Sequence, residues 1–360
     1  MVKGMTVYFA VIFLIALFSI LYSARCKTEK TRNTLLCWTV FFLLFLLLTL
    51  RNENMGADLL NKDMTGGYLV AYDELADKPW GVIFDGYLNY EAGYILLNKL
   101  VALLSGGNRQ IFLAVCALGS MLPVAYMIYC NSDTPAFSFL IYMGLPVFLL
   151  LYSGLRQSLA IGLTFLSVRY IQKRKPIPFI LLILAAAQFH YSAYLFLIAY
   201  PIYYLRMNTS LRVVSVFSLP VVFLLRYPLF SILSKLLKQN AAVEDNGAIT
   251  LFLVFFAIYF FCFIFTNESE EQNGYINLFF LACFCQAFGG VNSIALRMGY
   301  YFMMPLVLLL PKVDGSMRVE QERKLAKIVI LACFVLYGLY AISSSKWAEA
   351  NPYYWFWETV

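Results

Sequence analysis

Three basic residues are the first candidates for chemistry because each lies beside long apolar stretches of this 360-residue chain. Arg156 lies in Ser153-Gly-Leu-Arg-Gln157, Arg297 ends Asn292-Ser-Ile-Ala-Leu-Arg297, and His190 is the single histidine. A guanidinium at membrane depth costs roughly 2.5 to 17 kcal/mol, so a chain keeps one there where it pairs with another group. Arginine holds phosphate groups through charge-assisted, often bidentate, hydrogen bonds. These residues therefore predict an anion-binding site, with Arg156 as its leading member.

Acidic residues that could serve the same site follow an apolar run that ends near residue 50. They include Asp58, Asp63, Asp85 and Glu91. A carboxylate or an imidazole can accept a proton from a reacting hydroxyl group. We expect the general base among Asp58, Glu91 and His190, and the spacing alone does not choose between them.

Each of these residues also has a structural interpretation. Arg156 and Arg297 could reach lipid phosphates by snorkelling. Asp58 could cap a turn or helix, and Glu91 could interact with a helix dipole. His190, beside Tyr191 and Ser192, could be a hydrogen-bonded packing residue. Their expected grouping on one side of a membrane favours the functional interpretation.

The composition places the chain among membrane proteins. Hydrophobic residues make up 62% and charged residues 13%, and the mean hydropathy is +0.74. A soluble domain would carry roughly 25% charged residues. Apolar runs of about 20 residues recur along the chain, which predicts an all-α, polytopic transmembrane helical bundle. We expect one transmembrane domain over residues 1–360. The Cys283-x-Cys285 pair has no neighbouring histidine or second pair, so no metal site is expected.

Apolar runs and basic loops together predict the topology. Spans are expected at residues 7–22, 34–50, 110–129, 136–152, 157–171, 213–225, 249–266, 275–291, 295–310 and 326–344. Lysine and arginine favour cytoplasmic loops. The resulting map puts 15 of the 27 basic and 8 of the 20 acidic residues inside, so the whole net charge of +7 lies on that face. Both termini then lie on the external side of the membrane.

Two segments need a separate interpretation. Residues 92–104 are short and contain Lys99, so we expect an amphipathic helix on the outer surface, within an external loop over 51–109. Residues 176–205 have basic residues at both ends. Two half-helices that turn at His190 would keep both ends cytoplasmic, and a single tilted span is the alternative. With the half-helices the map has about 11–12 membrane segments.

Several short motifs, in order, resemble the EpsG family of bacterial exopolysaccharide polymerases, which is related to Wzy-type O-antigen polymerases. The motifs are Arg51…Gly56-x-Asp58…Tyr68, Tyr90-Glu91-x-Gly93-Tyr94-x-x-Leu97, Ser153-Gly-Leu-Arg156-Gln157-x-x-Ala160, Phe189-His190-Tyr-Ser192 and Arg297-x-x-Tyr300-Tyr301-Phe302. The resemblance extends from about Arg51 to Pro311. It differs around Asp58, because Asp63 is a second candidate in the same loop.

This resemblance implies an architecture similar to that of membrane-embedded, lipid-dependent glycosyltransferases. The activity would be glycosyl transfer at the outer face of the bacterial cytoplasmic membrane, joining oligosaccharide repeat units carried on polyprenyl pyrophosphate. Arg156, Arg297, Gln157 and Arg51 would hold the pyrophosphate, and Tyr68, Tyr191 and Tyr300 would contact sugars. The expected partners are lipid-linked donor and acceptor, membrane lipid and a chain-length regulator protein, with no nucleic acid and no cofactor. A divalent metal is not required.

Two other functions share some of these features. An O-antigen ligase-like glycosyltransferase would use the same kind of site, but it usually carries a larger external loop late in the chain than residues 226–248. A flippase or transporter of lipid-linked glycans would place its charges near the middle of the membrane and often shows repeated halves. No convincing internal repeat is present, so the sequence favours the polymerase.

Overall fold

The computed structural model describes residues 2–60, 67–236, 249–266 and 269–359, and all of its regular elements there are helices. A single antiparallel bridge, between Arg51 and Trp355, is the exception to helical pairing within these ranges. The all-α class is thereby confirmed, and the chain is a polytopic helical membrane protein. It forms two compact units, residues 1–194 with 328–360 and residues 195–327, which we describe separately.

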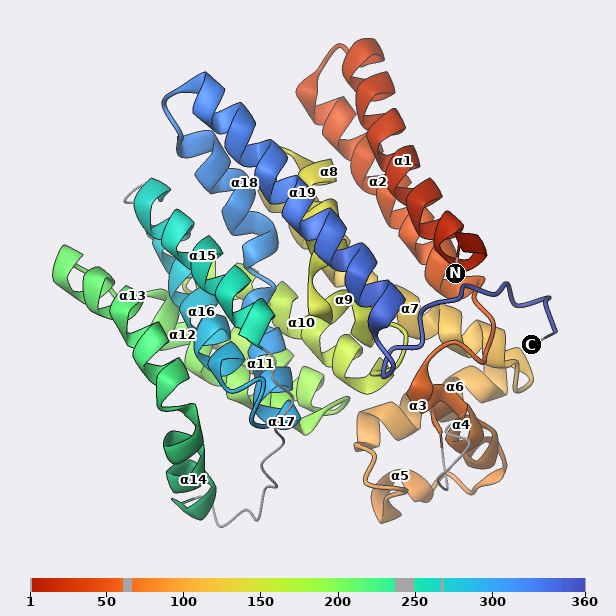
Figure 1. The fold of residues 1–360 in the computed structure, drawn as a ribbon. Coiled ribbons are helices and arrows are strands. Elements are labelled where there is room, and N and C mark those ends of the chain that lie inside the picture. Colours follow the sequence, from red (N-terminus) through yellow and green to blue (C-terminus); the bar gives the residue numbers. More distant parts are fainter. Residues whose placement is uncertain (1, 61–66, 237–248, 267–268, 360) are drawn as a thin grey trace. The chain divides into compact units, whose positions relative to one another are not determined.

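Unit 1 contains the segments that carry most of the predicted site residues (Figure 1). Its helices are α1 (Val2–Arg25), α2 (Glu29–Thr49), α3 (Ala57–Leu60), α4 (Tyr68–Asp77), α5 (Val82–Asp85), α6 (Ala92–Ser105), α7 (Arg109–Asn131), α8 (Pro135–Gly144), α9 (Pro146–Leu150), α10 (Leu155–Gln172), α11 (Pro176–Ala187) and the part of α19 (Glu320–Ser344) from Ile328 onward. The 3-10 helix η1 (Tyr191–Ile198) begins in this unit.

Unit 2 is built from shorter helices. They are α12 (Ala199–Tyr203), α13 (Thr209–Leu224), α14 (Arg226–Leu236), α15 (Ile249–Phe265), α16 (Glu270–Ala287), α17 (Ser293–Met303) and α18 (Leu306–Ser316). Helix α16 is central to this unit, because it packs against α12, α13, α15, α17 and α18.

Fewer long spans are present than the sequence predicts. Among the described residues, four helices are long and apolar enough to cross a membrane: Gly4–Arg25, α2, α7 and α19. Two bent pairs, α13 with α14 and α17 with α18, raise this number to six if each pair is one span. Single helices over 136–152 and 295–310 were expected, but both are broken, at Pro146 and near Pro305. Proline lacks the amide hydrogen that a continuous helix needs, and it disfavours helical backbone in the preceding residue.

Contacts within unit 1 define two ends. At one end, Asn33 at the start of α2 donates a hydrogen bond to the Asp133 carbonyl beyond α7. The α1–α2 turn and the α10–α11 turn lie at this end, and the residues in or beside them include seven basic ones: Arg25, Lys27, Lys30, Arg32, Lys173, Arg174 and Lys175. We call this the basic end of unit 1. The opposite end, called the site end, contains residues 50–58, 86–94, 107–110, 152–157, 188–191 and 350–358.

The C-terminal tail packs onto the site end. The Asn52 amide donates to the Tyr354 carbonyl (2.9 Å), and the Phe356 amide donates to the Leu50 carbonyl (2.9 Å). The Tyr353 hydroxyl donates to the Leu47 carbonyl (2.8 Å). The tail therefore covers the end of α2 and fixes where the 51–109 segment begins.

The 51–109 segment contains more helix than the one amphipathic helix that the sequence predicts. Helices α3, α4 and α5 precede α6, and α6 packs against α4, α5 and α7. Leu59, Tyr72, Tyr94 and Phe112 form part of the apolar core beneath them. The other side of α6 exposes leucines, with Leu104 at 85%. This packing places the start of α6 against the site end.

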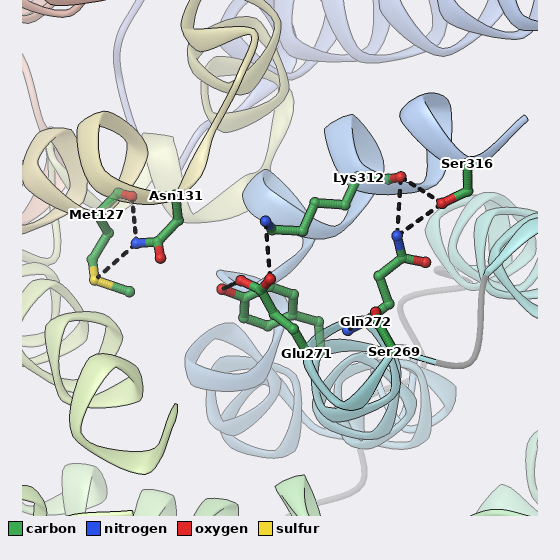
Figure 2. Close-up of polar contacts among 8 residues, drawn as sticks. Met127, Asn131, Ser269, Glu271, Gln272, Lys312 and Ser316 are labelled. Carbon is green, nitrogen blue, oxygen red and sulfur yellow. Dashed lines mark hydrogen bonds and ion pairs between the residues drawn. The ribbon is translucent and has the colours of Figure 1, made fainter. Parts of the chain in front are cut away.

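Unit 2 also brings basic residues to one of its ends. Lys312 Nζ lies 3.0 Å from Glu271 Oε2, and Gln272 Nε2 donates to Ser316 Oγ at 2.9 Å (Figure 2). Arg212 donates a hydrogen bond to Asn273 on the same turn. The sequence-based map puts these segments on the same, cytoplasmic side, and their contacts agree with that grouping.

The packing of α8 against α19 yields a first prediction. A Cβ atom added to Gly144 would lie 2.4 Å from the Phe334 carbonyl oxygen and 2.7 Å from the Phe334 Cβ. Gly144→Ala should therefore destabilise the protein by about 1–3 kcal/mol, because small residues allow such close helix approach. The measurement is the melting temperature of the detergent-solubilised protein. Gly315→Ala, where the added Cβ meets no atom within 4 Å, is the control. Equal melting temperatures for both variants would contradict the packing.

Candidate functional site

Arg156 is the second residue of α10, and its guanidinium forms hydrogen bonds with the segment that precedes α6. Arg156 Nη1 donates to Glu91 Oε2 at 2.8 Å and to the Asn89 carbonyl at 3.1 Å. The side chains of Arg156 and Glu91 are 20% and 3% exposed. A pair this buried is screened by solvent far less than a surface ion pair. The sequence identified both residues but did not show that they form a pair.

Aromatic rings flank the guanidinium. Its Cζ lies 4.5 Å from the ring centroid of Tyr90 and 5.9 Å from that of Tyr68, and the two rings stack with centroids 6.0 Å apart. Burial raises the pKa of Tyr90 above its ordinary value, so the phenol stays neutral beside the cation. Cation–π contact adds roughly 0.5–2 kcal/mol of attraction, depending on exposure. The rings therefore orient Arg156 from the side, while Glu91 and Asn89 hold Nη1.

The backbone at Leu88 and Asn89 explains how the Asn89 carbonyl reaches Arg156. Both residues have positive φ, 50° and 58°. Asparagine tolerates this left-handed conformation better than most residues, whereas a leucine there is uncommon. The turn was not predicted as part of the site. The signal for it was weak, since Asn89 and Tyr90 only precede the acidic residue that drew attention.

Glu91 connects three segments of unit 1. It is the N-cap residue of α6, but its side chain makes no capping hydrogen bond. Instead, Oε1 accepts a hydrogen bond from the Tyr191 amide (3.0 Å) and lies 3.6 Å from His190 Nδ1. Both carboxylate oxygens are therefore engaged. This arrangement suits a residue that positions Arg156 and the 190–191 turn better than one that takes up a proton.

A close backbone contact brings Glu91 to that turn. The Tyr94 amide donates to the Gln188 carbonyl at 3.0 Å. A Cβ atom on Gly93 would lie 2.5 Å from the Gln188 Cβ, so only glycine permits this approach without a shift. Helix α11 ends at Ala187 and η1 begins at Tyr191, so residues 188–190 form a break between them. His190 is 31% exposed there.

Asp58 lies on the same side as the aromatic pair. Its backbone amide donates to Ser153 Oγ at 3.1 Å, which ties α3 to the turn before α10. The carboxylate is half-buried and close enough to Tyr90 to contribute to the raised pKa of that phenol. No hydrogen bond to this carboxylate is present among the described residues. Asp63, the second candidate in this loop, lies outside the described residues.

The predicted sugar-contacting and amide residues occupy different environments. Gln157, next to Arg156 in α10, is buried, with 3% of its surface exposed. Tyr68 is half-buried in the aromatic pair, and Tyr191 is 63% exposed at the start of η1. In unit 2, Tyr300 is buried, with 3% of its surface exposed, and Arg297 is exposed on α17. Arg297 and Tyr300 stay predictions for this site.

Arg51 does not fit the predicted role of binding pyrophosphate. It is only 1% exposed, its Nη1 donates to the Leu151 carbonyl at 2.7 Å, and its guanidinium lies 4.8 Å from the Tyr152 ring centroid. The C-terminal tail covers it through the Arg51–Trp355 bridge. A group so enclosed holds the turn after α2 in place, and this burial depends on tail residues more than 300 positions away.

The arrangement can hold an anion and, separately, accept a proton. Arg156 supplies the cation, and Asp58 supplies a carboxylate without a hydrogen-bond partner in the described part of the chain. Within the same ranges, no three histidine, cysteine, aspartate or glutamate side chains gather as a metal site would require. The geometry defines the class of the protein: a multi-pass helical membrane protein with a polar, arginine-centred site at one end of unit 1.

Comparison with known families makes the assignment more specific. The model of the EpsG family matches residues 34–355. The chain therefore belongs to the EpsG family, which implies a function related to exopolysaccharide polymerisation. Comparisons with curated proteins and with solved structures gave no match.

The buried Arg156–Glu91 pair yields a stability prediction. Glu91→Ala should destabilise the protein by about 3–5 kcal/mol, because it leaves a largely buried guanidinium without its counter-charge. The measurement is thermal unfolding in detergent. The control is Glu29→Ala, which breaks the exposed Glu29–Arg32 pair, where Glu29 is 68% exposed. That change should stay within about 1 kcal/mol. Equal losses in the two variants would refute the buried pair.

Proposed function

We propose that this protein is a glycosyltransferase that polymerises oligosaccharide repeat units carried on polyprenyl pyrophosphate. Membership of the EpsG family supports the reaction class. The site supports the substrate class, because an arginine held in one orientation suits a pyrophosphate leaving group. The donor would be the growing lipid-linked glycan, and the acceptor would be a lipid-linked repeat unit.

The observation that carries the proposal is an unused donor on Arg156. A guanidinium has five N–H groups, and Nη1 serves Glu91 and Asn89. The Nε–H of Arg156 is buried and has no hydrogen-bond partner in the described part of the chain. Leaving a buried donor unpaired costs about 1–3 kcal/mol. The side chain as a whole is 20% exposed, so an anionic ligand can approach the guanidinium, and a small shift that brings its oxygen to Nε would remove this cost.

The reaction requires a positive charge close to the leaving group, which gains negative charge as the bond breaks. The bond between the anomeric carbon and a pyrophosphate oxygen breaks, and its electron pair goes to that oxygen. A new bond forms from the acceptor hydroxyl oxygen to the anomeric carbon. Arg156 speeds this step because its attraction strengthens as negative charge develops on the leaving oxygen.

The acceptor hydroxyl must lose its proton in the same process. We assign this proton to the carboxylate of Asp58, because both oxygens of Glu91 are already engaged. Glu91 then acts as a positioning residue for Arg156 and for the turn at His190. We retain Arg297 and Gln157 as further proposed pyrophosphate contacts. Tyr68, Tyr191 and Tyr300 are retained as proposed sugar contacts.

We further propose that the site end faces the outside of the cytoplasmic membrane. Seven lysine and arginine residues gather at the opposite, basic end of unit 1, in or directly beside the short α1–α2 and α10–α11 connections. Short loops rich in lysine and arginine favour the cytoplasm. The orientation places Arg156 where lipid-linked units would arrive after transfer across the membrane.

The first functional prediction concerns Arg156. Arg156→Ala should reduce polymerisation about 10²–10³-fold, as expected for the loss of one charge-stabilising donor, and single repeat units should accumulate on the lipid carrier. The measurement is glycan chain length in cells and in reconstituted membranes. The matched control is Arg169→Ala on the same helix, where the guanidinium lies 5.0 Å from the Tyr126 ring. Normal chain length in a stably inserted Arg156→Ala protein would refute the proposal. Loss of all external lipid-linked units would indicate a flippase.

The second functional prediction separates the base from the positioning carboxylate. Asp58→Asn should lower the rate about 10²–10⁴-fold without lowering the melting temperature, since its carboxylate is not part of a buried pair. Asp85→Asn, at an exposed position of α5, is the control. The measurement is the rate of repeat-unit joining in proteoliposomes, next to thermal unfolding. A wild-type rate for Asp58→Asn would exclude Asp58 as the base.

A further inference from the structure

A polar cavity lies at the site end of unit 1, and its lining does not include Arg156. Its volume is about 620 Å³, within the range of roughly 300–1,000 Å³ that is common for ligand pockets. Three distant segments form it: the turn after α2, the start of α7 and the C-terminal tail. The residues that matter for its chemistry are Asn52, Glu53, Asn54, Arg109, Phe356 and Glu358.

The charges around this cavity disfavour an anionic ligand. Arg109 is the cation that lines it, and this guanidinium is already shared between Glu53 (2.8 Å) and Asp73 (2.5 Å). Glu358 adds a further carboxylate to the lining. A phosphate or pyrophosphate would therefore meet net negative charge here, in contrast to the surroundings of Arg156.

The polar groups suit a ligand that carries many hydroxyl groups. Side-chain amides supply both donors and acceptors, and carboxylates accept from hydroxyl donors. The amides are also held in place: Asn52 Nδ2 donates to the Glu358 carbonyl (2.8 Å), and Asn54 Nδ2 donates to Asn52 Oδ1 (2.9 Å). Prior ordering of these groups lowers the entropy that binding would otherwise cost.

An aromatic surface completes the cavity. Phe356 lines it with a ring that is 46% exposed, and the adjacent Trp357 is 60% exposed. Trp357 stacks on Trp355 with centroids 5.1 Å apart, so the tail presents ordered rings. An apolar ring face beside fixed polar groups matches a sugar, which has C–H groups on its faces and hydroxyl groups around its edge.

Helix α6 lies between the Arg156 site and the cavity in the order of the chain. Glu91 precedes this helix, and the cavity begins just after it, near Arg109. The residues that line the cavity do not include those that contact Arg156, so a ligand that occupies both places would extend over more than one sugar.

We infer that this cavity binds an uncharged oligosaccharide, as a subsite for the glycan portion of a substrate whose pyrophosphate lies at Arg156. The identity of that glycan rests on the proposed function. The cavity would bind sugars that lie some distance from the reacting bond. It therefore favours acceptors or growing chains that are long enough to reach it. Binding energy from such remote parts of a substrate can be used to align the reacting groups.

The test uses the full-length protein in lipid nanodiscs and a glycan probe without lipid or phosphate. The probe is a set of oligosaccharides of one, two and three repeat units, released by hydrolysis from the host's own exopolysaccharide. Isothermal titration calorimetry should show saturable binding that strengthens with length. Phe356→Ala should weaken it about tenfold, the effect expected for losing one aromatic contact. Asn54→Ala provides a second variant at an independent contact.

Two controls decide whether the cavity is the binding place. Arg156→Ala should retain the wild-type dissociation constant for the lipid-free probe, and sodium pyrophosphate should not compete with it. Absence of saturable binding in an actively polymerising wild-type protein would overturn the inference and leave the proposed function intact. Unchanged binding in both Phe356→Ala and Asn54→Ala, or displacement by pyrophosphate, would also overturn it. Saturable binding by a wild-type protein that joins no repeat units in reconstituted membranes would count against the proposed function only.

Discussion

The carboxylate of Glu91 is almost completely buried, and its two oxygens meet groups from two other segments of the chain. One oxygen holds the Arg156 guanidinium at the start of α10, and the other accepts the Tyr191 amide beyond the end of α11. A buried carboxylate is stable only when such partners replace the water it has lost. The position of Arg156, of the 188–191 turn and of α6 therefore depends on this one group.

The surroundings of Glu91 are arranged so that this contact can form. Gly93 permits the backbone of α6 to approach Gln188, and the positive φ values at Leu88 and Asn89 turn a carbonyl toward Arg156. Tyr90 and Tyr68 then limit how far the guanidinium can move. Such a held arginine offers a fixed direction for charge stabilisation, which is more effective than a flexible cation. Arg51 shows the opposite case, since its contacts enclose it almost completely and leave it a structural role.

Some features of the site and of the fold can be predicted from the sequence, and others cannot. Arg156, Glu91 and His190 were recognised from residue type and apolar surroundings, and the structure brings these three together at one end of unit 1. A helix covers residues 92–105, and the chain leaves the helical conformation between α11 and η1; the surface position of the first and the half-helix pair stay predictions. The spans expected to be continuous over 136–152 and 295–310 are broken at prolines, which lack the backbone N–H that a continuous helix needs. Hydropathy does not show such a break, because it counts only how apolar the residues are. The sequence groups Arg51 with the substrate contacts, because nothing near Arg51 in the chain shows that the distant tail will bury it.

By itself, the sequence determined that this is an all-helical membrane protein of the EpsG family, and it determined which side chains are unusual enough to act. Those properties depend on composition, local periodicity and residue order, which are readable along the chain. The tertiary structure alone decided that Glu91 serves Arg156, that Arg51 is enclosed, and that the tail helps to form a polar cavity. The reason is physical: burial and hydrogen-bond partners arise from segments 65 to more than 300 residues apart, and no local pattern records which of them will meet.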